Sequence, residues 1–143
     1  MAINTFVIVD AGPLVAFLCQ RDSHHNWAKA AVENLPTPFF TSEAVLSEAC
    51  FLLNRYGVSH RHLFEMIDRE TIHVAFSLQE EFARIAALMS TYANRPMSLA
   101  DATLVRMAEL QDEAVIFTVD EDFRIYRKNG RQQIPLLIPD KKN

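Results

Sequence analysis

Short runs of apolar residues, each followed by a longer segment of helical periodicity, recur along this chain. The first run, Phe-Val-Ile-Val at 6–9, contains no polar residue, which is typical of a strand covered on both faces of a parallel sheet. Similar runs predict further strands at 39–41, 71–75, 114–118 and 134–138. Because Pro135 interrupts the last run, we expect that strand at an edge of the sheet.

Helical patterns fill the intervals between these strands. The predicted helices cover 13–19, 24–35, 43–56, 60–69, 78–93 and 99–111. This alternation of strands and helices predicts an α/β protein, in which helices cover a mostly parallel sheet of about four to five strands.

The composition is that of a globular protein with one core. The chain has 143 residues, of which 50% are hydrophobic, and we therefore expect a single domain over 1–143. Its 14 basic and 18 acidic residues leave a formal charge of −4, which excludes binding of nucleic acid by bulk positive charge. A phosphate-bearing substrate would need a metal ion or a local basic patch.

One local basic cluster does occur near the C-terminus, at Arg124, Arg127, Lys128 and Arg131. It either steers an RNA backbone or forms an ordinary solvated face, and the sequence leaves both readings open.

The sequence features that bear on cellular location favour the cytoplasm. No apolar run approaches the roughly 18 residues of a membrane span, and no basic leader precedes the first apolar segment. The two cysteines, Cys19 and Cys50, lie in apolar helical patterns, as expected of reduced core residues.

Four carboxylates stand at positions where strands meet helices. Asp10 and Asp120 each follow an apolar strand, Asp101 lies in the first turn of a predicted helix, and Glu48 lies within an apolar helical stripe. Each has a structural explanation of its own, such as a helix cap at Asp10 or a capping box between Asp101 and Ser98. However, ligands of open α/β sheets bind at the carboxyl ends of the strands, so we expect the acids to converge there if the first and fourth strands are neighbours.

Carboxylates gathered in one cleft repel one another, and a hard divalent cation relieves that repulsion. Oxygen ligands favour Mg²⁺ or Mn²⁺, whereas the absence of a compact Cys and His set disfavours zinc. Such a site suits phosphodiester hydrolysis, because the metal neutralises phosphate charge and lowers the pKa of a bound water. Whether one or two ions bind, and which acid acts as the general base, stays open.

The segments 9–14 (VDAGPL), 98–102 (SLADA) and 117–123 (FTVDEDF), with Glu48 in an apolar helix between them, resemble the PIN-domain family. They look closest to the VapC-type toxins of bacterial toxin–antitoxin pairs, and the resemblance spans nearly the whole chain. It implies a three-layer α/β/α fold and a metal-dependent endoribonuclease. It also implies a homodimer that is silenced when a cognate antitoxin threads a peptide into the acidic groove.

Carried over by position, the resemblance implies four catalytic and metal-binding acids, Asp10, Glu48, Asp101 and Asp120. Asp122 is an auxiliary metal ligand or an alternative to the last of them. Thr118 could orient a metal-bound water, and Ser98 supports the site as a helix cap. Ala11 departs from the pattern, because many relatives have Thr or Ser there, which weakens the polar surroundings of the site.

Three functions other than a ribonuclease are compatible with acids at strand ends, and the sequence disfavours two of them. A catalytically silent PIN-like module that binds RNA or protein is the main alternative. A receiver-like domain needs an acceptor Asp after the third strand, where the chain has only His-Val-Ala-Phe at 73–76. A haloacid-type phosphatase needs a second Asp close after Asp10, where Ala11 and Gly12 follow.

Overall fold

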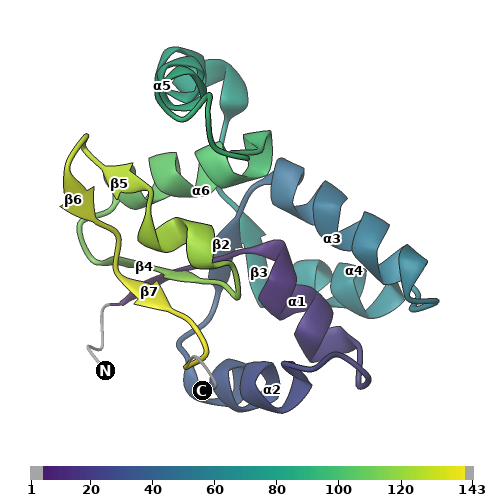
Figure 1. Cartoon of the computed structure of the whole chain (residues 1–143). Coiled ribbons are helices and arrows are strands. Elements are labelled where there is room, and N and C mark those ends of the chain that lie inside the picture. The colour runs from purple at the N-terminus through teal and green to yellow at the C-terminus, as the bar shows by residue number, and fades with distance from the viewer. Residues whose placement is uncertain (1–4, 141–143) are drawn as a thin grey trace.

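A five-stranded parallel sheet forms the centre of the computed structural model, which describes residues 5–140 (Figure 1). All neighbouring strands run parallel, in the order β3-β2-β1-β4-β7. The strands are β1 (Phe6–Val9), β2 (Phe39–Thr41), β3 (Ile72–Val74), β4 (Ala114–Phe117) and β7 (Leu136–Leu137). The five predicted strands are therefore confirmed, and β7 lies at an edge, as Pro135 indicates.

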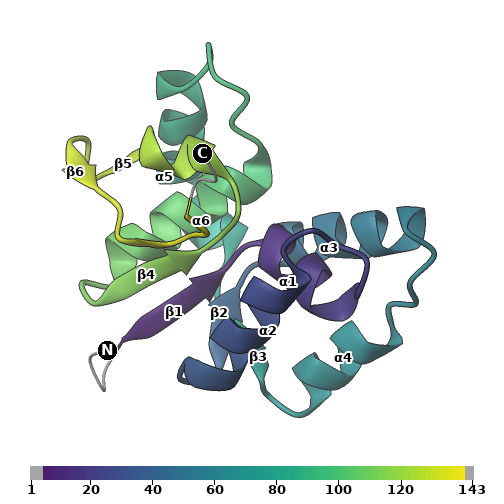
Figure 2. The same ribbon diagram turned by 60° about the horizontal axis from the view of Figure 1, so that its bottom comes forward.

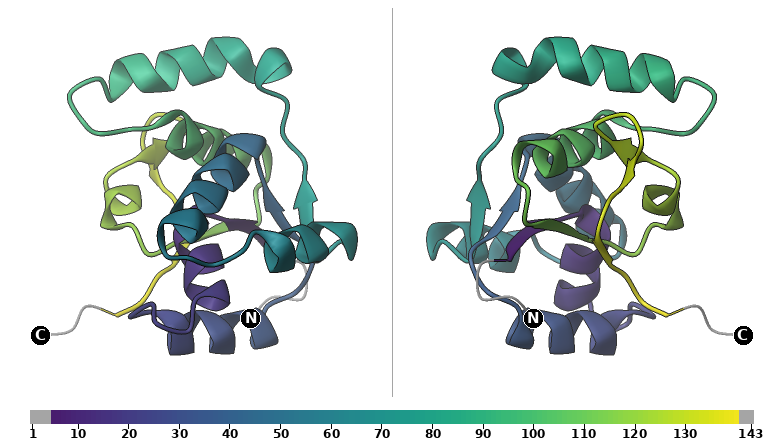
Figure 3. Two further views of the ribbon diagram at one scale, coloured as in Figure 1. Left: turned by 90° about the vertical axis from the view of Figure 1, so that its right-hand side faces the viewer. Right: turned by 90° about the vertical axis from the view of Figure 1, so that its left-hand side faces the viewer.

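Helices flank the sheet on both faces. Figures 1 and 3 show α1 and α2 on one side and α6 on the other, with α5 outside α6. This arrangement confirms the predicted three-layer α/β/α class. None of the helices described between residues 5 and 140 is long and apolar enough to cross a membrane. The helices are α1 (Ala11–Leu18), α2 (His25–Asn34), α3 (Glu43–Arg55), α4 (Arg61–Asp68), α5 (Leu78–Thr91) and α6 (Leu99–Leu110).

The central pair of strands, β1 and β4, determines where the carboxyl ends meet. They pair in register from Phe6 opposite Ala114 to Val9 opposite Phe117 (Figure 2). The backbone N–H of Asp10 extends this ladder by donating to the carbonyl of Phe117 over 3.0 Å. Since β2 lies on one side of this pair and β7 on the other, the strand order reverses here. In open α/β sheets, ligands bind at the carboxyl edge beside such a reversal.

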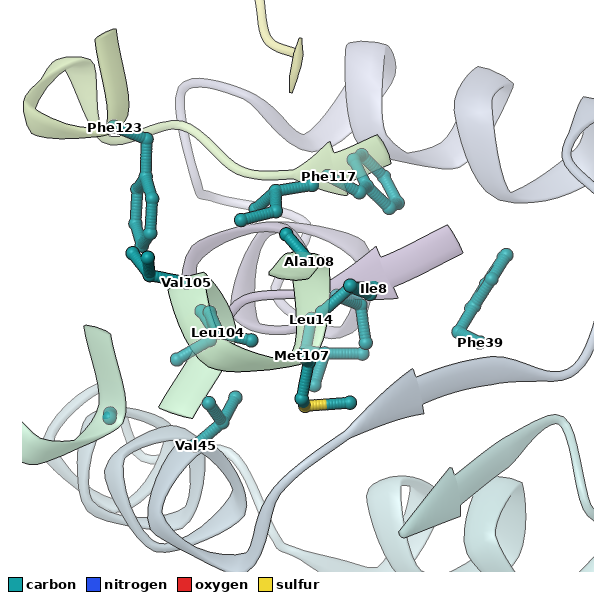
Figure 4. Close-up of a cluster of buried hydrophobic side chains, with 14 of the residues drawn as sticks. Ile8, Leu14, Phe39, Val45, Leu104, Val105, Met107, Ala108, Phe117 and Phe123 are labelled. Carbon is teal, nitrogen blue, oxygen red and sulfur yellow. The ribbon is translucent and has the colours of Figure 1, made fainter. Parts of the chain in front are cut away.

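Buried side chains from the sheet, α1, α3 and α6 interlock in one core, which Figure 4 shows in close-up. Phe117, at the end of β4, packs edge to face on Phe39 and Trp27, with ring centroids 6.1 and 5.3 Å apart. Helix α3 packs on both α1 and α6 and so connects the two layers. This close packing holds the ends of β1 and β4 in fixed positions.

The segment after β4 is the part of the fold that the sequence pattern misses. It contains a 3₁₀ turn, η1 (Glu121–Arg124), and a small antiparallel hairpin of β5 (Arg127–Lys128) and β6 (Gln132–Gln133). Two-residue strands are too short to show alternation of apolar and polar residues. The turn between them has positive φ at Asn129 and Gly130, 53° and 83°.

Gly12 brings the first turn of α1 against the loop that follows β4. A Cβ atom at this position would overlap the Cγ2 methyl group of Val119. Val119 directly precedes Asp120, so the missing side chain lets the Asp120 loop lie close to Asp10.

We expect Gly12→Ala to destabilise the protein by about 1–3 kcal/mol, because the added methyl group must displace Val119. Alanine is more favourable than glycine inside a helix by up to about 1 kcal/mol, and this gain offsets part of the cost. Urea denaturation measures the difference. Val119→Ala in the Gly12→Ala background should restore part of the loss, and a Gly12→Ala protein as stable as the wild type would contradict the proposed overlap.

Candidate active site

Asp10 ends β1 and caps the N-terminus of α1. Its Oδ1 accepts a hydrogen bond from the Ala11 N–H over 2.8 Å, and its Oδ2 accepts one from the Thr118 hydroxyl over 2.7 Å. The residue is 6% exposed. The capping explanation is therefore correct, but it accounts for only one of the two carboxylate oxygens.

Thr118 connects the first of the predicted acids to the last. Its fully buried hydroxyl donates to Asp10 and accepts from the backbone N–H of Asp120 over 3.0 Å. The sequence suggests that this hydroxyl orients a metal-bound water. In the structure its single proton is directed at Asp10, so it acts on the carboxylate instead.

Asp120 caps the η1 turn, and its Oδ1 accepts from the Asp122 N–H over 2.8 Å. The charge of Asp120 acts on both Glu48 and Asp101, whereas the charge of Asp122 acts on Asp120 and Tyr126. These charge interactions link Asp120 more directly to the other acids, and its assignment as the fourth acid stays a prediction.

Asp101 lies at the start of α6 and is 8% exposed. It forms a capping box with Ser98: the Asp101 N–H donates to the Ser98 hydroxyl over 3.0 Å, and the Ser98 N–H donates to Asp101 Oδ2 over 3.2 Å. The hydroxyl of Tyr126 donates to the same Oδ2 over 3.3 Å. The sequence identified the capping box but not the contribution of Tyr126.

Glu48 is exposed on α3, and its predicted place on a buried face is wrong. The buried line of α3 runs through Val45, Ala49 and Leu53, each four residues from the last. Glu48 lies beside that line, at its solvent edge. It nevertheless stays within electrostatic reach of Asp10, Asp101 and Asp120.

A pair of hydroxyl groups fixes α3 relative to α6. The Thr103 hydroxyl donates to the Ala100 carbonyl over 2.7 Å, so in the 2.8 Å contact with Ser42 the serine is the donor. Ser42 also caps α3 by accepting from the Val45 N–H. Sequence reasoning finds the cap at Ser42, but no local signal reveals a partner 61 residues away.

All four acids are harder to ionise than usual. Burial, and then repulsion by Asp101 and Glu48, raises the pKa of Asp10 to about 7 against the hydrogen bonds from Thr118 and Ala11. Desolvation is also the main cause that raises the pKa of Glu48, Asp101 and Asp120. Repulsion adds to it, from other acids of the cluster at Glu48 and Asp101, and from Asp122 and Glu121 at Asp120. Among residues 5–140, none of the ion pairs involves any of the four.

Glu109 shows how the same fold treats a carboxylate whose charge is compensated. Its side chain is 1% exposed and accepts two hydrogen bonds from Arg84, at 2.8 and 2.7 Å, and one from Arg106 at 3.2 Å. Burial alone would raise the pKa of Glu109, but these bonds and one from the Asn129 N–H lower it below its usual range. Within residues 5–140, the four acids form no ion pair of this kind.

The donor set of the acidic cluster fits a hard divalent cation. It consists of carboxylate oxygens with uncompensated charge, which is the chemistry that Mg²⁺ and Mn²⁺ select. Within the described chain, no group of three His, Cys, Asp or Glu side chains is arranged to hold a metal ion. Mg²⁺ is usually bound by one or two carboxylates together with water and substrate phosphate.

The basic cluster is only partly available to a polyanion. Arg124 pairs with Glu121, and one nitrogen of Arg127 donates to the carbonyls of the preceding turn. Lys128 lies half-buried in β5, and Arg131 is exposed in the turn of the hairpin. Steering of RNA by this cluster therefore depends mainly on these two residues, and it stays a prediction.

Comparison with known proteins agrees with the fold. The model of the PIN domain family matches residues 7–129. The crystal structure of VapC20 from Mycobacterium tuberculosis, described as a sarcin–ricin loop cleaving toxin, superposes with a TM-score of 0.70 at 22% sequence identity. The match covers 81% of this chain and 91% of that chain. No curated protein matches the chain in sequence.

In the absence of metal, stability should fall as the pH rises from about 4 to about 7. The folded pKa of Asp10, about 7, lies above the ordinary value of 3.8, so folding favours the protonated acid. That stabilisation is complete below the ordinary pKa and is lost as the pH passes the folded value. At pH 8 in EDTA, Asp10→Asn should therefore be more stable than the wild type by on the order of a few kcal/mol.

Urea denaturation between pH 5 and pH 8 measures this effect, with Glu109→Gln as a control of opposite sign. Because the pKa of Glu109 is lowered, its carboxylate stabilises the fold at neutral pH, and its loss should destabilise the protein. An Asp10→Asn variant less stable than the wild type at pH 8 in EDTA would contradict the burial of an uncompensated charge.

Proposed function

The chain belongs to the PIN domain family, and from that premise we propose that it is a divalent-metal-dependent endoribonuclease that hydrolyses RNA phosphodiester bonds. We assign it the role of toxin in a type II toxin–antitoxin pair, acting in the cytoplasm as a single nuclease domain over 1–143. The observation that carries the proposal is the cluster of Asp10, Glu48, Asp101 and Asp120, whose charges act on one another. None of the four forms an ion pair within residues 5–140.

How each of the four acids would bind the metal ion depends on its burial. Asp10 and Asp101 are buried and held by hydrogen bonds, so they would provide the fixed oxygens of an Mg²⁺ or Mn²⁺ site. Glu48 and Asp120 are less buried and lie nearer to solvent, where they would hold the ion through water. When bound, the ion neutralises phosphate charge and activates water for attack on phosphorus. One of the four carboxylates would accept the proton of that water.

The substrate we propose is RNA. The shape similarity to VapC20 makes the sarcin–ricin loop the first RNA to test, followed by transfer and messenger RNA. The net charge of −4 makes an RNA complex depend on the bound cation, and Lys128 and Arg131 are the side chains expected to add local attraction.

Two protein partners follow from the family assignment. We propose that a cognate antitoxin silences the enzyme by occupying the acidic groove. We also propose that the chain forms a homodimer. The exposed large apolar side chains that support an interface between copies include Phe51 on α3, Phe64 on α4 and Phe82 on α5.

Replacing either buried acid should abolish cleavage and leave the fold intact. We expect Asp10→Asn and Asp101→Asn to lower the rate of RNA cleavage roughly 100-fold or more, because each variant removes a fixed anionic oxygen. Expression of either variant should no longer arrest growth, and EDTA should stop cleavage by the wild type until Mg²⁺ or Mn²⁺ is restored. The assay measures cleavage of total RNA and of a sarcin–ricin stem-loop.

Asp112→Asn provides a matched control, since Asp112 is an exposed acid outside the cluster. It should cleave at the wild-type rate. Wild-type activity in both Asp10→Asn and Asp101→Asn would refute the site. A wild-type protein without metal-dependent cleavage of any RNA would instead indicate a binding module.

Sedimentation or light scattering should give twice the 16.3 kDa mass of the chain. Phe51→Ser and Phe82→Ser place a polar residue on α3 and α5, and the variant that lies in the interface should run as a monomer with unchanged secondary structure. A wild-type protein that stays monomeric at high micromolar concentration would rule out the dimer.

A further inference from the structure

Tyr126 is a buried polar side chain beside the acids that the proposed function does not use. It is among the largest fully buried residues of the chain. Its ring packs edge to face on Phe123 and Tyr92, with centroids 5.3 and 5.1 Å away. Its hydroxyl lies 3.3 Å from Oδ2 of Asp101.

The segment that delivers Tyr126 is the one that carries the fourth acid. The Tyr126 N–H donates to the carbonyl of Asp122 over 3.2 Å, and the Phe123 N–H donates to the carbonyl of Asp120 over 3.3 Å. These bonds form one tight turn in which Asp120 acts on Asp101 through its charge, while Tyr126 contacts Asp101 directly. The hydroxyl thus connects the loop after β4 to the first turn of α6.

Contacts on the far side of the ring hold Tyr126 in place. Tyr92, just after α5, packs against it, and the Tyr92 hydroxyl accepts the backbone N–H of Arg127 over 2.9 Å. Since Phe123 packs on the ring as well, Tyr126 has little freedom to move its hydroxyl away from Asp101. The donor is therefore fixed before any ligand binds.

The two oxygens of Asp101 have different surroundings. Oδ2 accepts from Tyr126 and from the Ser98 N–H, whereas no hydrogen bond given for the described residues ends on Oδ1. The Ser98 side chain also lies close enough to the carboxylate to lower its pKa. Hydrogen bonds to one oxygen restrict rotation of the carboxylate, so its second oxygen points in a defined direction. Hydrogen-bond partners of metal ligands commonly act in this way, by fixing the ligand before the ion arrives.

We propose that Tyr126 is a positioning residue for the metal-binding carboxylate of Asp101. It holds Oδ2, leaves Oδ1 for the cation, and keeps the Asp120 loop against α6. This inference rests on the metal-dependent nuclease function proposed above, and it assigns a role to a residue outside the four acids.

Titration of the purified protein with Mn²⁺ by calorimetry tests the proposal directly. Tyr126→Phe removes only the hydroxyl, and we expect the Kd for Mn²⁺ to rise about 10-fold. Tyr56→Phe is the control, because it removes the hydroxyl of an exposed tyrosine at the end of α3, away from Asp101 and from the aromatic cluster around Tyr126. Its Kd for Mn²⁺ should equal that of the wild type, and both variants should melt close to the wild-type temperature.

A cleavage assay gives a second measurement. The Mn²⁺ concentration for half-maximal cleavage should rise with the Kd in Tyr126→Phe, while the rate at saturating Mn²⁺ recovers most of the wild-type value. A general structural defect would lower the saturated rate as well.

The outcomes separate this inference from the proposed function. If the wild type binds Mn²⁺ and cleaves RNA, and Tyr126→Phe has the same Kd, the inference is overturned and the nuclease function stands. If Tyr126→Phe unfolds, the hydroxyl has a structural role and the inference is again overturned. A wild type that neither binds Mn²⁺ nor cleaves RNA overturns both.

Discussion

Mutual repulsion among carboxylates at one edge of the sheet is the constraint on which the rest of this structure depends. The pairing of β1 with β4 places Asp10 next to the loop that carries Asp120, and α3 and α6 bring Glu48 and Asp101 within reach of both. Like charges in a partly buried site raise the free energy of the fold unless they are protonated or compensated. The closely packed core around Phe117 offsets this unfavourable energy and holds the strand ends together.

Neutral hydroxyl groups, and not cations, hold the acids in position. Thr118 joins Asp10 to Asp120, Ser98 and Tyr126 hold Asp101, and a contact between Ser42 and Thr103 fixes α3 on α6. An arginine in any of these places would orient a carboxylate equally well, but it would also neutralise the charge. Glu109 illustrates that alternative, since its two arginines leave it no capacity for a further cation. Orientation without neutralisation is what a site for a divalent ion requires.

Local signals explain why so much of the fold was predictable. Apolar runs at β1 and β4 end in Asp10 and just before Asp120, and parallel pairing of those runs is enough to bring the two acids together. Long-range packing explains what was missed. The exposure of Glu48 depends on which line of α3 faces the core, and the contact of Tyr126 with Asp101 depends on a 3₁₀ turn too short to show periodicity. The partner of Ser42 lies 61 residues away, where no local pattern can point.

Asp10 caps the start of α1, Asp101 completes the capping box at the start of α6, and both belong to the acidic cluster. An asparagine at either position keeps a side-chain oxygen that can accept the capping hydrogen bond, and it removes the repulsive charge. A single base change converts an aspartate codon into an asparagine codon. Under the proposed function, one base change would therefore remove an anionic metal ligand and at the same time stabilise the metal-free fold.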